Sequence, residues 1–244
     1  MDTRRTFLIT CEHGGNRIPA RYRECFEGKG YLLRSHHGYD IGALPLARQL
    51  AQQLQAPLFY SNVSRLLVDL NRTTQHPRLH SEAVRRLSAD TRRRILEVYY
   101  QPFRDQVESA VNAAVTSGHR VIHISSHSFT PVLDGAVRTA DVGLLYDPIR
   151  AGEVALCTDW RRAIKALQPA LRVRRNYPYL GTSDGFTAHL RRHFPADQYL
   201  GIELEINQGI VASTASWKAL RSVLVSALTV SYTHLRAHET KANL

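Results

Sequence analysis

Short apolar runs rich in β-branched residues alternate along this chain with longer amphipathic runs, and this alternation restricts the folds open to it. The order favours strand–helix–strand units, which build a mostly parallel or mixed central sheet with helices on both faces. No internal repeat or linker divides the sequence, so we predict an α/β fold with a single domain over residues 1–230. The expected strands are 6–11, 57–61, 64–70, 120–126, 141–146, 171–175 and 199–206, and the expected helices are 41–54, 89–117 with a break at Pro102, 152–167, 184–193 and 214–229.

Composition excludes several classes of protein. The chain has 244 residues and is 43% hydrophobic, which is enough for a sizeable core and argues against disorder. No stretch approaches the roughly 18 apolar residues of a membrane span. The first apolar run is too short for a signal peptide, because Glu12 and His13 interrupt it. Three widely spaced cysteines disfavour a disulfide framework. We therefore expect a soluble, cytoplasmic protein with no membrane partner.

The net charge of +11 comes mainly from arginine, since only four of the 32 basic residues are lysine. These arginines fall in short groups on expected helix surfaces, whereas a nucleic-acid site favours a basic stripe interleaved with aromatic residues. This pattern disfavours nucleic acid as a partner. A positive field that attracts small acidic substrates fits the same charge.

The last residues differ from the rest of the chain. From Val230 onward the sequence reads VSYTHLRAHETKANL, which breaks the preceding helical pattern and resembles a translated sequencing-adaptor tail. We expect residues 231–244 not to be native sequence, and we exclude His234 and His238 as candidate ligands.

Two polar clusters lie near the start of the chain, after an expected strand and before an expected helix, where open α/β sheets bind ligands. In CEHGGNRIP, two glycines after His13 permit a tight turn that leaves the imidazole accessible, although a structural histidine is the alternative. In HHGYDIG, Asp40 is either a helix N-cap or a carboxylate metal ligand. His37 is a further candidate ligand in this cluster.

A third cluster, SRLLVDLNR, ends an apolar run. Arg72 there has a planar guanidinium that can hold a carboxylate through two hydrogen bonds, and Asn71 can donate beside it. The alternative is a turn in which Asp69 forms a surface ion pair with an arginine.

Two further clusters follow in the second half of the chain. In HISSHSF, His127 ends the expected strand and is a candidate metal ligand, whereas His123 is expected to be packed inside it. The serines of this segment lack the context of a nucleophile elbow. In GIELEINQ, Glu203 and Glu205 share one face of a strand, so burial would require a partner for at least one of them. An edge strand with one face in solvent is the alternative.

Taken together and in order, these clusters resemble the N-formylglutamate amidohydrolase family, itself similar to zinc carboxypeptidases and aspartoacylases. The resemblance implies a zinc-carboxypeptidase/phosphorylase-hydrolase-like fold and a metal-dependent hydrolase. The matching segments run from Cys11 to Gln208 and read CEHGGNRIP, HHGYDIGA, SRLLVDLNR, HISSHSF, DVGLLYDP, NYPYLGTSDGF and GIELEINQ.

The resemblance also implies roles for individual residues. His13 and His127 would hold zinc, Asn71 with Arg72 would bind the substrate carboxylate, and Glu205 would be the general base. The wider zinc carboxypeptidase pattern has a carboxylate three residues after its first histidine, and this chain has an asparagine there, Asn16. The third ligand is therefore open, with Asp40 favoured over Glu12 and Asn16.

The expected reaction is hydrolysis of the amide of N-formyl-L-glutamate or a related acidic N-acyl amino acid, with one Zn²⁺ ion held by His13, Asp40 and His127. Arg65 is a second candidate for binding a substrate carboxylate or the oxyanion. The alternatives are a carboxypeptidase-like hydrolase of small peptides, a family member that binds an acidic metabolite without turnover, and a non-enzymatic basic nucleic-acid-binding domain. The oligomeric state is left open.

Overall fold

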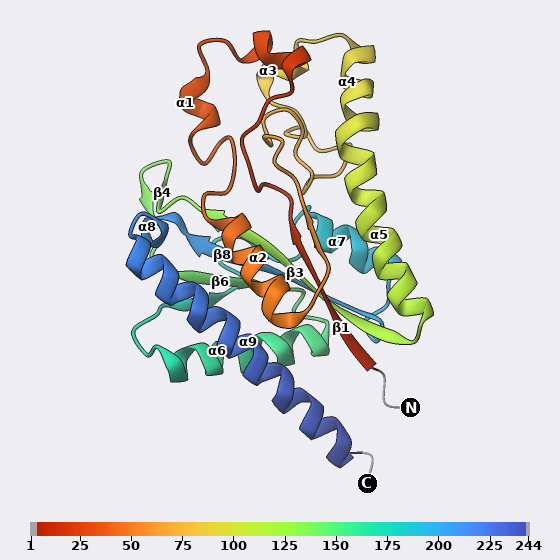
Figure 1. Cartoon of the computed structure of the whole chain (residues 1–244), viewed down its shortest axis with the longest axis vertical. Coiled ribbons are helices and arrows are strands. Elements are labelled where there is room, and N and C mark those ends of the chain that lie inside the picture. The colour runs from red at the N-terminus through yellow and green to blue at the C-terminus, as the bar shows by residue number, and fades with distance from the viewer. Residues whose placement is uncertain (1–3, 243–244) are drawn as a thin grey trace.

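The computed structural model describes residues 4–242, and it describes side chains as far as Ser231. Its centre is a six-stranded sheet in the order β2-β1-β3-β8-β6-β7 (Figure 1). The first four of these strands are mutually parallel, whereas β6 runs antiparallel to β8 and β7 runs parallel to β6. The expected α/β fold with a mostly parallel, mixed sheet is therefore confirmed. The strands are β1 (Arg4–Cys11), β2 (Leu58–Tyr60), β3 (His119–Phe129), β6 (Val142–Leu145), β7 (Val173–Arg175) and β8 (Tyr199–Asn207).

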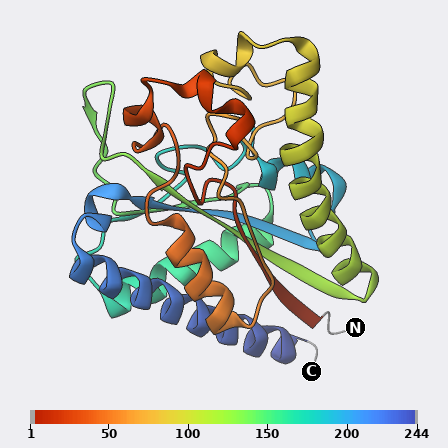
Figure 2. The same ribbon diagram turned by 45° about the horizontal axis from the view of Figure 1, so that its top comes forward.

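Helices cover both faces of the sheet. On one face lie α2 (Ala43–Leu54), α6 (Ala151–Leu167) and α9 (Thr214–Ala242), and on the other lie α5 (Gln101–Thr116) and α7 (Phe186–His193) (Figures 1 and 2). The shorter elements, none of which the sequence pattern predicts separately, are η1 (Ala20–Phe26), α1 (Gly30–Leu33), α3 (Glu82–Arg85), α4 (Ala89–Ile95), η2 (Leu96–Tyr100), α8 (Gln208–Val211) and the hairpin of β4 (Val132–Leu133) and β5 (Ala136–Val137).

The two faces of the sheet differ in polarity. The face under α2, α6 and α9 is largely apolar, and side chains such as Ile124, Ile202 and Trp160 are fully buried there. Burial of this kind contributes roughly 25 cal/mol per Å² of apolar surface. The opposite face is apolar only near the start of its strands, where Leu8 and Val121 pack under the other helices. Its carboxyl-terminal half carries polar side chains instead, and this half forms the floor of the site.

The expected helix at 89–117 does not break at Pro102 but runs on without interruption, with a change in its hydrogen-bonding pattern just before the proline (Figure 1). It is divided into α4, the five-residue π-helical segment η2, and α5, with Pro102 in the first turn of α5. A proline inside a helix removes one backbone hydrogen bond, and its ring collides with the preceding turn. The five-residue π-helical segment directly before α5 changes the hydrogen-bonding pattern at this point, so the helix continues past the proline.

Two expected elements differ from the structure. Residues 64–70 do not form a strand but a turn-rich loop, in which Leu67 and Val68 are nonetheless buried. An apolar run indicates that a segment is buried, but it does not say whether the segment is a strand or a loop. Here the segment is a loop, and it is buried because other segments pack around it. The helix expected at 214–229 continues to Ala242 as α9. We also expect residues 231–244 not to be native sequence. The side chains of this segment beyond Ser231 lie outside the described residues, so the structure does not test this expectation.

Although α9 has 29 residues, it is not apolar enough to cross a bilayer, and the same holds for every other helix within residues 4–242.

Candidate metal centre and substrate pocket

The polar half of the sheet is created by strand register. In β3, Ser125 and His127 point to the same face, and they pair with Glu203 and Glu205 of β8. On the other side of β3, Thr10 of β1 pairs with Ser125. Parallel strands end at the same edge of a sheet, so side chains that are distant in sequence meet here.

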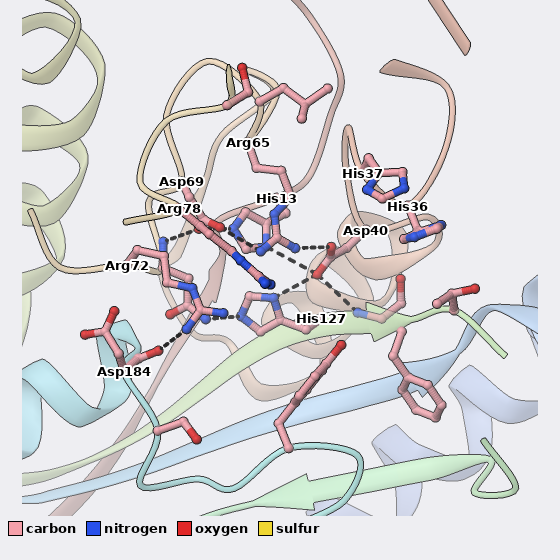
Figure 3. Close-up of a pocket in the computed structure, with 18 of the residues that line it drawn as sticks. His13, His36, His37, Asp40, Arg65, Asp69, Arg72, Arg78, His127 and Asp184 are labelled. Atoms are coloured by element: carbon pink, nitrogen blue, oxygen red, sulfur yellow. Dashed lines mark hydrogen bonds and ion pairs between the residues drawn. The ribbon is translucent and has the colours of Figure 1, made fainter. Parts of the chain in front are cut away.

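A cleft of about 640 Å³ opens over this edge (Figure 3). Its walls come from the loop after β1, the segment before α2, residues 65–85, the end of β3, the loop before α7 and β8. The lining residues that the sequence singled out are His13, His37, Asp40, Arg65, Asn71, Arg72, His127, Glu203 and Glu205. Five clusters that are scattered along the sequence therefore converge on one cavity.

Two imidazoles and one carboxylate meet at the floor of the cleft. The Asp40 Oδ2 atom lies 2.8 Å from His127 Nδ1 and 3.4 Å from His13 Nδ1. The centroids of the two imidazole rings are 5.1 Å apart. All three side chains are buried, and their ligand atoms lie within 4.8 Å of one another.

The opposite nitrogens of both imidazoles are held by further polar groups. His13 Nε2 lies 2.7 Å from Asp69 Oδ1, and His127 Nε2 lies 2.8 Å from Ser125 Oγ and 3.3 Å from Glu12 Oε2. A carboxylate on the far nitrogen of a histidine fixes the orientation of the ring and makes the near nitrogen a better ligand. Both Nδ1 atoms are therefore prepared to bind a cation beside Asp40.

Asp40 does not cap α2. The N-cap of α2 is Gly42, in the left-handed region at φ 89°, and no side chain caps the helix. The Asp40 carboxylate instead contacts His13, His127 and Arg65. Burial opposes its ionisation, but these positive or hydrogen-bonding neighbours keep the pKa of Asp40 well below its usual value.

Three carboxylates at the floor are held in the ionised form. Burial would raise the pKa of Glu12, but contact with His127 lowers it to about 2. Burial likewise opposes ionisation of Asp69, yet Arg65 and His13 keep its pKa below the usual range. With Asp40, these groups place three negative charges around one arginine and two imidazoles. A buried excess of negative charge favours a bound cation.

The donor set fits a divalent ion of the zinc type. Two donors on a tetrahedral zinc, each at about 2.0 Å, lie about 3.3 Å apart. The spacings of 2.8 and 3.4 Å between Asp40 Oδ2 and the two Nδ1 atoms bracket that value. Of the alternatives for the third ligand, Glu12 contacts the far nitrogen of His127, and Asn16 does not line the cleft.

The two glutamates of β8 differ in their contacts. β8 lies between β3 and β6, so the edge-strand alternative is wrong. Glu203 accepts a hydrogen bond of 2.7 Å from Thr187 Oγ1, whereas the buried Oε2 atom of Glu205 has no partner among the described residues. Burial raises the pKa of Glu205 to about 8, and Asp40 and Glu203 contribute to this rise.

The cationic side chains of the cleft are not equally available. Arg65 donates to Asp69 at 2.7 Å and to Asp40 at 3.3 Å, so it braces the two carboxylates. Asp69 does pair with an arginine, as one alternative expected, but its carboxylate is buried rather than on the surface, and Arg65 is partly buried. Arg72 donates one hydrogen bond to the carbonyl oxygen of Asp184 at 2.7 Å.

Arg78 was missed by the sequence reasoning. Figure 3 shows its side chain extending into the cleft toward His127. Its guanidinium has no hydrogen bond or ion pair with any residue that the structure describes. Its sequence context, QHPR without an apolar run, offers no sign that could have identified it; only the path of the loop brings it into the cleft.

The remaining candidate residues, His123, Ser126 and His37, do not belong to the group around Asp40. His123 lies between Thr10 Oγ1 at 2.8 Å and the Tyr199 hydroxyl at 2.6 Å, so it is packed and hydrogen-bonded as expected. Ser126 donates to the carbonyl oxygen of Ala43, away from the cleft. His37 stacks on His36 at the rim, with ring centroids 4.1 Å apart, and does not join the metal-ligating group.

Asn71 links the cleft to α7. Its Oδ1 atom accepts a hydrogen bond of 2.6 Å from the backbone amide of Phe186, the first residue of α7. Its Nδ2 atom lies 3.5 Å from His127 Nε2. The side chain is thus fixed between α7 and the metal-ligating group.

The fold and the site together define a class of α/β proteins. In this class a buried His/Asp group lies at the carboxyl ends of the central strands and is suited to a divalent ion. A family model for N-formylglutamate amidohydrolase matches residues 5–212. The match covers most of the chain, so the chain belongs to the N-formylglutamate amidohydrolase family, as the sequence resemblance implied. No curated protein sequence gives a significant match.

Two solved structures are similar over nearly the whole chain. Gene product Atu2144 from Agrobacterium tumefaciens has a TM-score of 0.81 and 29% identity, covering 96% of this chain and 92% of that chain. The N-formylglutamate amidohydrolase from Ralstonia eutropha JMP134 has a TM-score of 0.67 and 18% identity, covering 97% of this chain and 96% of that chain. Both likenesses agree with the expected fold.

Proposed function

We propose that this protein is a zinc-dependent amidohydrolase that cleaves N-formyl-L-glutamate, or a closely related acidic N-acyl amino acid, to the free amino acid and a carboxylate. One observation carries the proposal. A buried His/Asp group that could hold a metal ion lines a single cleft of about 640 Å³, together with a glutamate oxygen and an arginine that have no partner among the described residues. Membership of the N-formylglutamate amidohydrolase family supports the same reaction.

His13, Asp40 and His127 would hold the ion, and three protein ligands leave a position open for water, as in catalytic zinc sites. When bound, zinc supplies Lewis-acid chemistry, which polarises a carbonyl group and makes water more acidic. Around it, Asp69 and Glu12 fix the two imidazoles.

Glu205 is the proposed general base. Its Oε2 atom is buried in the wall of the cleft and has no competing partner among the described residues. It would accept a proton from the attacking water and donate it to the departing amine. A pKa raised to about 8 by burial suits a group that must both take up and release a proton near neutral pH.

Arg72 and Arg78 are proposed to bind the substrate carboxylates. Arg65 is occupied by Asp40 and Asp69, so we assign it to bracing the metal ligands rather than to direct substrate binding. Arg78 has no competing partner among the described residues, and Arg72 uses one nitrogen on Asp184. Two cations in one cleft match a substrate with two carboxylates.

The test is formate release from a pair of substrates that share the scissile bond. N-formyl-L-glutamate and N-formyl-L-leucine differ in the second carboxylate, and a charge-assisted contact is worth about 1.5–3 kcal/mol. We expect kcat/KM to be roughly 10- to 150-fold higher for the glutamate compound. Cleavage of small peptides without formate release would favour the carboxypeptidase-like alternative, and no hydrolysis of either class in zinc-loaded protein would exclude the proposal.

A further inference from the structure

A second group of metal-ligating side chains lies outside the cleft, where α7 packs beside α5. Glu108 projects from α5, and His189 and His193 project from α7. The two histidines are four residues apart, so they lie one helical turn apart on the same side of α7. No function described above uses these three residues.

The spacing of the donor atoms is close to that of a metal site. His189 Nε2 lies 3.3 Å from Glu108 Oε2, which equals the separation of about 3.3 Å between two donors on a tetrahedral zinc. The ligand atoms of all three residues lie within 4.8 Å of one another. The rings of His189 and His193 have centroids 4.4 Å apart, so a small rotation of the exposed His193 ring closes the remaining gap.

A backbone contact fixes the hydrogen position on one imidazole. His193 Nδ1 lies 3.0 Å from the carbonyl oxygen of His189 and donates a hydrogen bond to it. The proton is then on Nδ1, which leaves the lone pair of Nε2 free for a metal ion. A backbone carbonyl on the far nitrogen is a frequent partner of metal-binding histidines.

The carboxylate of this group is also available. The nearby Arg104 is not paired with Glu108: its guanidinium lies 4.1 Å from the centroid of the Phe186 ring and donates to the carbonyl oxygen of Leu70. Within the described chain, Glu108 forms an ion pair with His189 alone. The Glu108 and His189 side chains are 36% and 24% exposed, so water can fill the open coordination positions.

We propose that Glu108, His189 and His193 bind a divalent transition-metal ion of the zinc class, which cross-links α5 to α7. The other end of α7 is hydrogen-bonded to two residues that line the cleft: the Phe186 amide donates to Asn71, and the Thr187 hydroxyl donates to Glu203. The bound ion therefore stabilises the helix that holds these two lining residues in place, and it does so from the opposite end of α7.

The test compares zinc binding by the unmodified protein and by His193→Ala, after removal of metal by a chelator. We expect His193→Ala to bind one equivalent of Zn²⁺ fewer per chain by calorimetry or by dialysis with metal analysis. Every other histidine is present in both proteins, so binding in the cleft or elsewhere cancels in this difference. The result is therefore independent of whether the proposed amidohydrolase site binds zinc.

Arg192→Ala is the matched control, because it removes an exposed side chain from the same turn of α7 without removing a ligand. It should keep the full number of zinc equivalents. Glu108→Gln, which keeps the size of the side chain, should weaken the same binding step, and added zinc should raise the Tm of the unmodified protein more than that of either ligand variant. Equal zinc stoichiometry in the unmodified protein and His193→Ala would overturn the proposal, as would an equal loss in Arg192→Ala.

Discussion

The buried carboxylates of the cleft differ in whether a cationic or imidazole side chain contacts them. Glu12, Asp40 and Asp69 contact imidazoles or Arg65 and have lowered pKa values, whereas Glu205 lacks such contacts and its pKa rises to about 8. Carboxyl groups whose environments separate their pKa values in this way take different roles in a hydrolytic site. The first three would hold and orient a cation, and Glu205 would move the proton.

Replacing Glu205 by Gln should lower kcat by roughly 10²–10⁴-fold, because the amide has nearly the same shape but cannot accept the proton. Bound zinc should remain at the level of the unmodified protein. The measurement is formate release together with metal analysis of the same sample. Ser126→Ala is the control, since its hydroxyl bonds to Ala43 outside the cleft, and it should keep its activity. Unchanged turnover in Glu205→Gln would remove this residue from the chemistry.

Arg78→Ala should raise KM for N-formyl-L-glutamate by about 10- to 100-fold with a smaller effect on kcat, because the lost contact is a charge-assisted hydrogen bond to substrate. Arg78→Lys should recover part of the loss. Arg86→Ala is a suitable control, because Arg86 pairs with Glu82 on the surface and does not line the cleft. Equal KM values for Arg78→Ala and Arg86→Ala would contradict the assignment.

Positions at strand ends made His13, Asp40 and His127 candidates, and the resemblance to the N-formylglutamate amidohydrolase family implied that they meet; the structure places them together. The role of Arg65 was less predictable: the sequence offered it as a substrate ligand, whereas its contacts are with Asp40 and Asp69. Which of several arginines is free depends on loop geometry, and residue spacing does not encode that geometry.

At the scale of elements, β3 carries polar residues on one face through most of its length. His123 lies in the middle of this strand and is fully buried. Burial lowers the pKa of His123 to about 4, from an ordinary value of 6.5, because the charged form has no carboxylate in contact with it. The folded protein therefore holds this imidazole neutral while the unfolded chain takes up a proton.

This difference predicts acid lability between pH 6.5 and 4. As pH falls through this range, the unfolded state gains a proton that the folded state does not, so the free energy of unfolding should drop by up to about 3 kcal/mol. Denaturant unfolding at a series of pH values gives the slope. His123→Gln should flatten it, and His119→Gln, at the start of the same strand, should not. An unchanged slope in His123→Gln would refute this explanation.

Helices and strands were predicted correctly where the sequence has a strong periodic pattern. The prediction failed where a buried loop has the apolar composition of a strand. The amphipathic pattern of α2 and the apolar alternation of β8 were both predictable within a few residues. Residues 64–70 look like a buried strand because they are apolar, yet they form a loop under a layer of short helices and turns. That layer contains elements of only four to seven residues, too short for any periodic signal.

At the scale of the whole molecule, the net charge of +11 should assist capture of an acidic substrate. Salt screens such attraction, since the Debye length falls to about 8 Å at physiological ionic strength. We therefore expect kcat/KM for N-formyl-L-glutamate to fall several-fold between roughly 20 and 200 mM salt. The value for N-formyl-L-leucine, which has one carboxylate fewer, should fall less. Equal salt dependence for the two compounds would show that the charge serves another purpose, and tight salt-sensitive binding of nucleic acid would favour that alternative.

The most direct measurement is the activity of chelator-treated, metal-free protein before and after zinc is returned. We predict that the metal-free protein releases no formate from N-formyl-L-glutamate and that activity returns with zinc. His127→Ala, prepared in the same way, should not recover. Full formate release by protein that metal analysis shows to be free of divalent ions would contradict the account.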